Sequence, residues 1–156
     1  MQKIASIHGV LVSIDLRGVL ILGDPGVGKS QLALALLDRG HVFIADDLVL
    51  VSLDDDGQLI GVAAEVYQGF LAVREVGLLD VKKLYPNQVL PSVTIDMVIK
   101  LYQDHQRFKT TEGHDLTAIQ SKTQILGKSL ITYKLFTGAN RPLALLLECM
   151  VKRLNT

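Results

Sequence analysis

The sequence predicts a single α/β domain that carries additional antiparallel strands and ends in a helix. The chain has 156 residues, the length of one domain, and its hydrophobic content of 49% is enough to fill a core. The first 50 residues contain short apolar runs typical of strands, and one segment between them has the periodicity of a helix. We therefore expect residues 1–156 to fold as one domain around a sheet.

The first part of the chain favours a hairpin followed by a helix and another strand. Residues 9–15 and 18–23 are short, branched and apolar, and the residues between them suit a turn. Residues 29–39 place three leucines on one helical face, and Gly40 suits the end of a helix. A strand at residues 41–45 would complete a right-handed parallel unit of strand, helix and strand.

The rest of the chain is expected to add strands and a final helix. Apolar runs separated by turn residues predict a hairpin and two later strands, and Pro142 suits the start of a helix. The hairpin is expected at residues 48–53 and 58–64, the two later strands at residues 93–101 and 129–135, and the helix at residues 143–154. Residues 66–92 have weak periodicity, and the polar residues 103–123 are expected to be rich in loops.

A glycine-rich segment lies between the second expected strand and the helix. Residues 23–30 match the pattern G-x-x-x-x-G-K-[S/T], the Walker A motif or P-loop, in the strand-to-helix context that the motif requires. In such a loop, backbone N–H groups converge on phosphates, the lysine neutralises charge on them, and the hydroxyl binds Mg²⁺. The predicted nucleotide-binding residues are Gly23, Asp24, Pro25, Gly26, Val27, Gly28, Lys29 and Ser30. The alternative is a glycine-rich turn with a solvated lysine.

Two adjacent carboxylates follow the strand expected at residues 41–45. Asp46 and Asp47 should emerge at the same edge of the sheet as the glycine-rich segment. One of them could hold Mg²⁺, and the other could accept a proton from a hydroxyl nucleophile. The alternative is that they only solvate the end of a strand.

The composition limits the partners and the setting of the protein. Sixteen basic and sixteen acidic residues give a net charge of zero, so neither nucleic acid nor a membrane is an expected partner. The single cysteine, Cys149, excludes a disulfide framework, and no apolar stretch reaches the ~20 residues that span a bilayer. We expect a cytoplasmic protein.

The segments together resemble a known family. HGVLV, then GVLILGDPGVGKSQLALALLDRGHVFIADD, VREVGLLDV, ILG and NRPLALLLECMVKRL follow in the order found in the catalytic domain of bacterial HPr kinase/phosphorylase. The resemblance covers essentially the whole chain. It implies a P-loop fold of the HPr kinase type and an enzyme that regulates carbon metabolism.

The resemblance also implies the reaction and the partners. Such an enzyme phosphorylates a serine of the phosphocarrier protein HPr with ATP or pyrophosphate, requires Mg²⁺, and reverses the reaction by phosphorolysis. The family is usually hexameric, and a separate N-terminal domain commonly precedes the catalytic one. Here Met1 is expected to be a true start.

The site residues of the family can be carried over to this sequence one at a time. Its phosphate-contacting histidine corresponds to His8, which on sequence alone is more simply a surface residue before the first strand. Its phosphate-loop lysine corresponds to Lys29 and its metal-binding hydroxyl to Ser30. Its catalytic aspartate, which is the base in the forward direction and the acid in the reverse, corresponds to Asp47, with Asp46 on the metal side.

Four positions depart from the family pattern or align less securely. The signature Glu-aliphatic-Arg-Gly is replaced at its first position by Ala72 and at its last by Glu75, so either Glu75 reaches the metal or metal binding is weaker. Of a basic pair tied to dephosphorylation, only Arg141 remains. Arg107 is a further catalytic candidate, with a solvated loop arginine as the alternative reading.

Two other functions remain open at the level of the sequence. One is a different P-loop kinase with another acceptor. The other is a non-catalytic regulator that binds nucleotide. In that case, the replacement of the family's glutamate by Ala72 would reflect the loss of catalytic activity. Magnesium-dependent phosphate transfer separates the regulator from the kinases, and the acceptor separates the two kinases.

Overall fold

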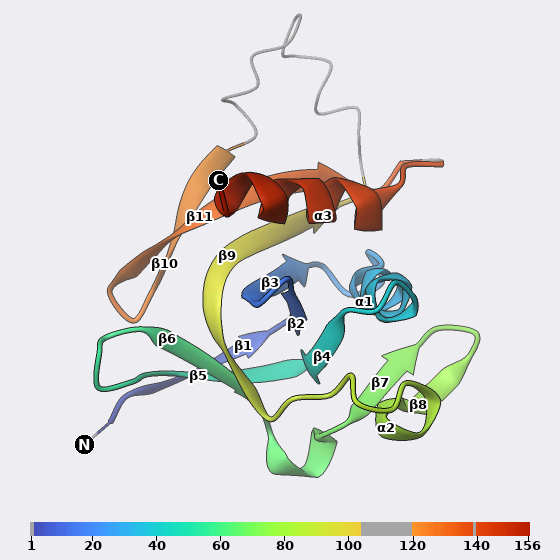
Figure 1. Cartoon of the computed structure of the whole chain (residues 1–156), viewed down its shortest axis with the longest axis horizontal. Coiled ribbons are helices and arrows are strands. Elements are labelled where there is room, and N and C mark those ends of the chain that lie inside the picture. The colour runs from blue at the N-terminus through green and yellow to red at the C-terminus, as the bar shows by residue number, and fades with distance from the viewer. Residues whose placement is uncertain (1, 104–119, 139) are drawn as a thin grey trace, which may run out of the picture.

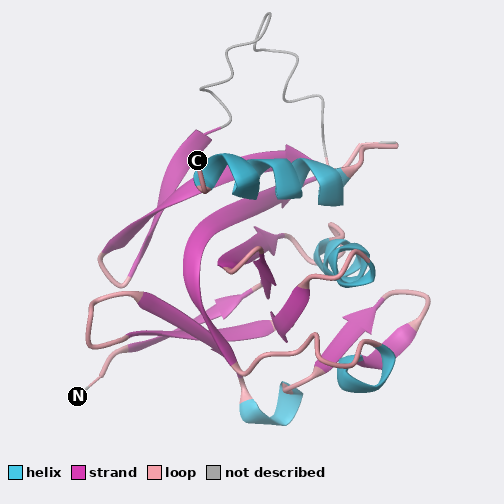
Figure 2. Cartoon of the chain, viewed as in Figure 1, coloured by secondary structure: helices cyan, strands magenta, loops and turns pink. Residues whose placement is uncertain are grey.

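The computed structural model describes residues 2–103, 120–138 and 140–156 and shows a mixed α/β fold (Figure 1). Single helices separate groups of consecutive strands along the chain, and the last element is a helix (Figure 2). The strands are β1 (Ile4–His8), β2 (Val10–Ile14), β3 (Arg17–Gly23), β4 (Val42–Ala45), β5 (Leu48–Leu53), β6 (Leu59–Ala63), β7 (Phe70–Val73), β8 (Gly77–Asp80), β9 (Ser92–Tyr102), β10 (Gln120–Ile125) and β11 (Lys128–Phe136). The helices are α1 (Lys29–Asp38), α2 (Val81–Leu84), α3 (Leu143–Leu154) and the short 3-10 helix η1 (Glu65–Tyr67).

The long strand β9 holds the sheet together. Its first residues pair with β6 in antiparallel fashion, and the residues from Ile95 to Tyr102 pair in parallel with β3 on one side and β11 on the other. The strand order is β1-β5-β6-β9-β3-β2-β4, with β11 and β10 continuing from β9. In Figure 1, β9 is the long curved yellow strand. The carboxyl ends of β3, β9 and β11 therefore lie at one edge of the sheet.

The strands on either side of α1 run in the same direction, as the sequence predicts. β2 pairs in antiparallel fashion with both β3 and β4, so these two strands are parallel to each other but are separated by β2. The β2–β3 and β5–β6 hairpins, the strand β9, the strand β11 and the final helix lie where the sequence predicts them.

The sequence-based expectation was incomplete in three places. Residues 4–8 form the edge strand β1, which pairs with β5 and is exposed at alternate positions. Within residues 66–92, β7 and β8 form a separate two-stranded sheet, followed by α2. Residues 120–125 form β10, although residues 103–123 were expected to be rich in loops. β1 becomes a strand by pairing with the distant β5, whereas β7 with β8 and β10 with β11 pair with the next strand in the sequence. Local periodicity reveals none of these pairings, because the segments are short or polar.

The buried residues form two clusters on the two faces of the central strands. Along β3, Val19 and Ile21 belong to one cluster, while Leu20 belongs to the other, as the alternation of a strand requires. The first cluster also contains Leu36 of α1 and Leu147 of α3, so both helices cover the same face. Among the described residues, no helix is long and apolar enough to cross a membrane.

The two helices are also joined by charged side chains. Glu148 of α3 accepts hydrogen bonds from Arg39 at the end of α1, over 2.6 and 2.8 Å. His41 Nε2 lies 2.5 Å from the same carboxylate. These hydrogen bonds, those from Arg39 foremost, lower the pKa of Glu148 to about 2.

Candidate active site

A loop of glycines joins the end of β3 to the start of α1. Gly26 and Gly28 have φ values of 84° and 114°, in the region that side chains avoid. Gly28 caps α1 without a side-chain hydrogen bond, so the N–H groups at the start of the helix have no side-chain acceptor there. These N–H groups and the positive end of the helix dipole form a suitable environment for an anion. We call residues 23–28 the glycine loop.

The ammonium group of Lys29 lies folded over the glycine loop. Its Nζ atom donates hydrogen bonds to the carbonyl oxygens of Gly23, over 2.6 Å, and Asp24, over 3.1 Å. In the described part of the chain, no carboxylate forms an ion pair with Lys29. The lysine is held by neutral acceptors, so its charge remains available to an anion above the loop.

Asp46 is buried and joined to two different elements. Its Oδ1 atom accepts a hydrogen bond from the Ser30 hydroxyl over 3.2 Å, and its Oδ2 atom accepts one from the backbone N–H of Ala72 over 2.9 Å. The residue is 8% exposed, and this burial raises the pKa of its carboxyl group, with the two hydrogen bonds acting in the opposite direction. A bound cation would favour the ionised form and offset the cost of burial.

Asp47 has a different environment from its neighbour. It is exposed, and its φ of 71° places it in the left-handed region, which aspartate and asparagine tolerate better than most residues. Its carbonyl oxygen accepts a hydrogen bond from Gly9 N over 3.2 Å. The tight turn between β4 and β5 therefore places Asp46 in a buried position at Ser30 and Asp47 in an exposed position, where a ligand could contact it.

His8 is the last residue of β1 and not a residue that precedes the first strand. The pairing of β1 with β5 sets His8 opposite Leu48, next to Asp47. His8 is exposed. The edge strand that the sequence analysis missed is thus the element that brings His8 to the aspartates.

A cavity of about 540 Å³ brings together five residues predicted to take part in catalysis or metal binding. They are His8, Lys29, Ser30, Asp46 and Asp47. Part of its wall is apolar and comes from Tyr67 of η1, from Phe70 of β7 and from Leu78 of β8, which are all exposed. The remaining catalytic candidate, Arg107, lies outside the described residues.

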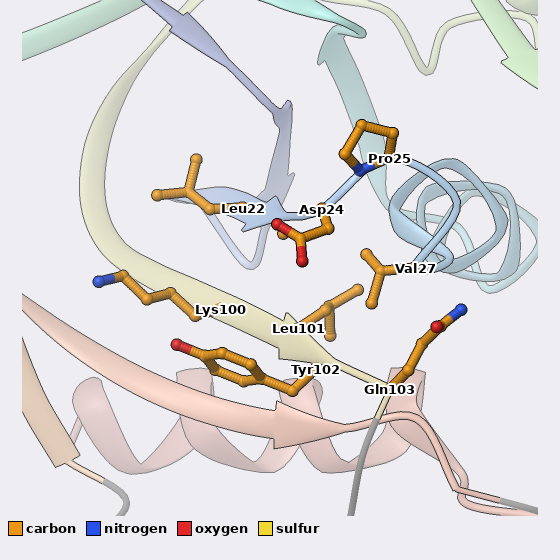
Figure 3. A pocket seen from close by; sticks show the side chains of 9 residues that line it. Leu22, Asp24, Pro25, Val27, Lys100, Leu101, Tyr102 and Gln103 are labelled. Atoms are coloured by element: carbon orange, nitrogen blue, oxygen red, sulfur yellow. The ribbon is translucent and has the colours of Figure 1, made fainter.

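A second cavity, of about 490 Å³, borders the glycine loop on the side of β9 (Figure 3). Lys100, Tyr102 and Gln103 line it from β9 and the residue after it, facing Asp24 and Pro25 of the loop. The Gln103 side chain donates a hydrogen bond to Gly26 O over 3.1 Å. These residues could not be predicted from the sequence, because no local signal shows that β9 pairs with β3.

A third cavity, of about 220 Å³, lies at the start of α1. Lys29 and Ser30 line it from the helix, and Ala72 and Arg74 line it from the β7–β8 hairpin. Glu75, in the turn of this hairpin, is exposed and lines none of the three cavities. In the sequence, Arg74 stands between Ala72 and Glu75 in the segment aligned with the family signature, and its basic side chain was the available signal of a site residue.

The fold and this site define a mixed α/β protein with a central sheet, a C-terminal helix and, at the start of its first helix, a cavity into which charged side chains converge. The family model "HPr Serine kinase C-terminal domain" matches residues 1–156. The chain therefore belongs to the HPr kinase C-terminal domain family.

Individual relatives agree with this assignment. HPr kinase/phosphorylase from Lachnoclostridium phytofermentans is 35% identical over 145 residues, which are 92% of this chain and 46% of the relative. The protein of the same description from Limosilactobacillus reuteri is 45% identical over 97 residues, or 62% of this chain and 30% of the relative. The chain thus spans less than half the length of these curated relatives. A structure described as the Hpr(Ser) kinase/phosphatase from Coxiella burnetii aligns with a TM-score of 0.86 and 29% identity, over 97% of this chain and 90% of that one.

Proposed function

We propose that the protein phosphorylates a serine of HPr or an HPr-like phosphocarrier with ATP or pyrophosphate, and reverses this by phosphorolysis. The observation that carries the proposal is the cavity in which Lys29, Ser30, Asp46, Asp47 and His8 meet, in a chain of this family. Residues 1–156 would form one catalytic domain, acting in the cytoplasm as part of a homo-oligomer, for which the family suggests a hexamer.

The glycine loop would act as a P-loop for the donor. Its backbone N–H groups and the start of α1 would bind the phosphates, and Lys29 would leave its carbonyl acceptors to neutralise them. The carbonyl contacts support this role, because an ammonium group held only by neutral oxygens loses little by turning to a phosphate.

The donor set at Ser30 and Asp46 fits Mg²⁺. The ion prefers hydroxyl, carboxylate and phosphate oxygens, and these two side chains already lie within hydrogen-bond distance. No group of three or more His, Cys, Asp or Glu side chains among the described residues could hold a metal, so further ligands would come from the phosphates and water. When bound, Mg²⁺ would neutralise charge on the phosphates.

Asp47 would act as the general base. As the serine oxygen forms its bond to the terminal phosphorus of the donor, the bond from that phosphorus to the leaving oxygen breaks, and the serine proton passes to Asp47. His8, beside Asp47, would contact the transferring phosphoryl group. In reverse, inorganic phosphate attacks the phosphoserine, pyrophosphate forms, and Asp47 returns the proton to the serine oxygen.

The test is an incubation of the protein with Mg-ATP and HPr from the same organism, with the intact mass of HPr as the readout. We expect one added phosphate with the wild type and none with Lys29→Ala. Added inorganic phosphate should then remove it and produce pyrophosphate. Unmodified HPr, together with retained nucleotide binding, would contradict the proposal and favour a regulator or a kinase with another acceptor.

A further inference from the structure

The cavity on the β9 side of the glycine loop differs in its lining from the cavity that contains the aspartates. Its volume of about 490 Å³ is within the ~300–1,000 Å³ that is usual for small-molecule sites. Apolar and aromatic side chains form part of its wall, among them Leu22, Val27, Leu101 and Tyr102 (Figure 3). Gly23 and Pro25 line both cavities, so the glycine loop lies between the two.

The charged groups of this cavity balance each other. Among the described residues that line it, Asp24 of the glycine loop and Lys100 of β9 carry the charges, one of each sign. The Asp24 carboxylate points into the space between the loop and β9 (Figure 3), and it forms no ion pair within the described part of the chain. A carboxylate repels phosphate but accepts hydrogen bonds from neutral hydroxyl or amino groups. The cavity therefore suits an uncharged polar group better than a phosphate.

The aromatic ring of Tyr102 is held in place from the side of β11. It stacks on the ring of Phe136, with the centroids 5.5 Å apart and the planes at 29°. The carbonyl oxygen of Tyr102 accepts hydrogen bonds from the N–H of Thr137, over 2.8 Å, and from its hydroxyl, over 3.3 Å. Leu101 belongs to the core cluster beneath α1 and α3, so the alternate residues Lys100 and Tyr102 face the other side of the sheet. A ring that is already ordered loses little conformational freedom when a planar ligand packs against it.

We propose that this cavity binds the sugar and base of a nucleoside triphosphate whose phosphates lie on the glycine loop. The inference rests on the proposed function and makes a nucleotide, not pyrophosphate, the preferred donor. The base would pack against Tyr102 and the apolar wall, and the sugar hydroxyls would donate hydrogen bonds to Asp24. The phosphate chain would extend from there to Lys29 and Ser30. Because every base can stack on an aromatic ring, the cavity would select nucleotides as a class.

Inorganic tripolyphosphate is the probe that separates the nucleoside from the phosphates, because it has as many phosphates as ATP and no sugar or base. Calorimetry in the presence of Mg²⁺ measures the affinity for each ligand. We expect the wild type to bind ATP at least about tenfold more tightly than tripolyphosphate, the size of one base stacked on an aromatic ring. Tyr102→Leu keeps an apolar side chain beside Phe136 and removes the aromatic face. It should weaken the binding of ATP about tenfold and leave that of tripolyphosphate unchanged.

Tyr102→Phe is the matched control, because it keeps the ring and should bind ATP as the wild type does. Binding of tripolyphosphate shows that the glycine loop of each variant is intact, and the comparison within the wild type needs no variant. Equal affinities of the wild type for ATP and tripolyphosphate would overturn the nucleoside cavity and leave the proposed function standing. An unchanged affinity of Tyr102→Leu for ATP, or equal losses for both ligands, would do the same. A wild type that binds neither these ligands nor pyrophosphate would overturn both proposals.

Discussion

The Ser30 hydroxyl donates a hydrogen bond to Asp46 Oδ1 over 3.2 Å and joins the first turn of α1 to the end of β4. The two residues are 16 positions apart, and both lie at the edge of the sheet where the glycine loop ends. Because Asp46 is buried, its ionised form needs either a cation or the hydrogen bonds from the Ser30 hydroxyl and the Ala72 N–H. The contact therefore prepares an oxygen-lined position before any ligand arrives.

Asp47→Asn should separate binding from chemistry. Asparagine tolerates the left-handed backbone of this position, so the substitution removes the base without adding strain. We expect the transfer rate to fall by about 10²–10⁴-fold while the affinity for nucleotide stays within a factor of two or so. Single-turnover transfer and calorimetry measure the two quantities. Unchanged turnover would remove Asp47 from the mechanism.

Ala72→Glu should tighten the binding of Mg²⁺ severalfold. Position 72 is exposed to the cavities that contain Ser30 and Asp46, so a carboxylate there can reach an ion held by them. The apparent affinity is measured by titrating Mg²⁺ into the protein with bound pyrophosphate. Ala72→Gln controls for size without charge and should have a much smaller effect. Equal affinities for the two variants would place residue 72 outside the reach of the ion.

Glu148→Gln should destabilise the protein in a pH-dependent way. The pKa of Glu148 is lowered from 4.5 to about 2, mainly by the hydrogen bond from Arg39, so the folded state favours the ionised carboxylate. Its contribution is present above pH 4.5 and is lost as the pH falls from 4.5 towards 2. In urea, the unfolding midpoint of the variant should lie below that of the wild type at pH 7, and the gap should close in acid. A gap that is independent of pH would contradict this.

Gln103→Leu should weaken donor binding by loosening the glycine loop. The substitution removes the hydrogen bond to Gly26 O, and one such bond contributes about 1 kcal/mol, or roughly fivefold in affinity. Gln103→Glu should be worse, since a carboxylate cannot donate to the carbonyl. Gln124→Leu, on the exposed face of β10, is the control. Calorimetry with Mg-ATP measures the affinities of the wild type and the three variants. Equal affinities for all four proteins would show that the Gln103 contact does not hold the loop.

The local features of this protein could be predicted from its sequence. The glycine loop, the start of α1, the aspartate pair and the final helix each depend on residues close together in the chain, so spacing reveals them. The role of β1 could not be predicted in this way, because it depends on pairing with β5 some 45 residues later. The same holds for Arg74 and Gln103, which reach the loop only through the folding of a weakly periodic hairpin and the parallel pairing of β9.

The glycine loop borders two cavities of similar size, one on the side of the aspartates and one on the side of β9. The consequence is kinetic. If the protein is the proposed kinase, an acceptor that covers the first cavity would leave the β9 side of the loop open, so the spent donor could depart before the acceptor does. Both substrates would then be bound together before transfer, in either order, and double-reciprocal plots of initial rates should intersect and not run parallel.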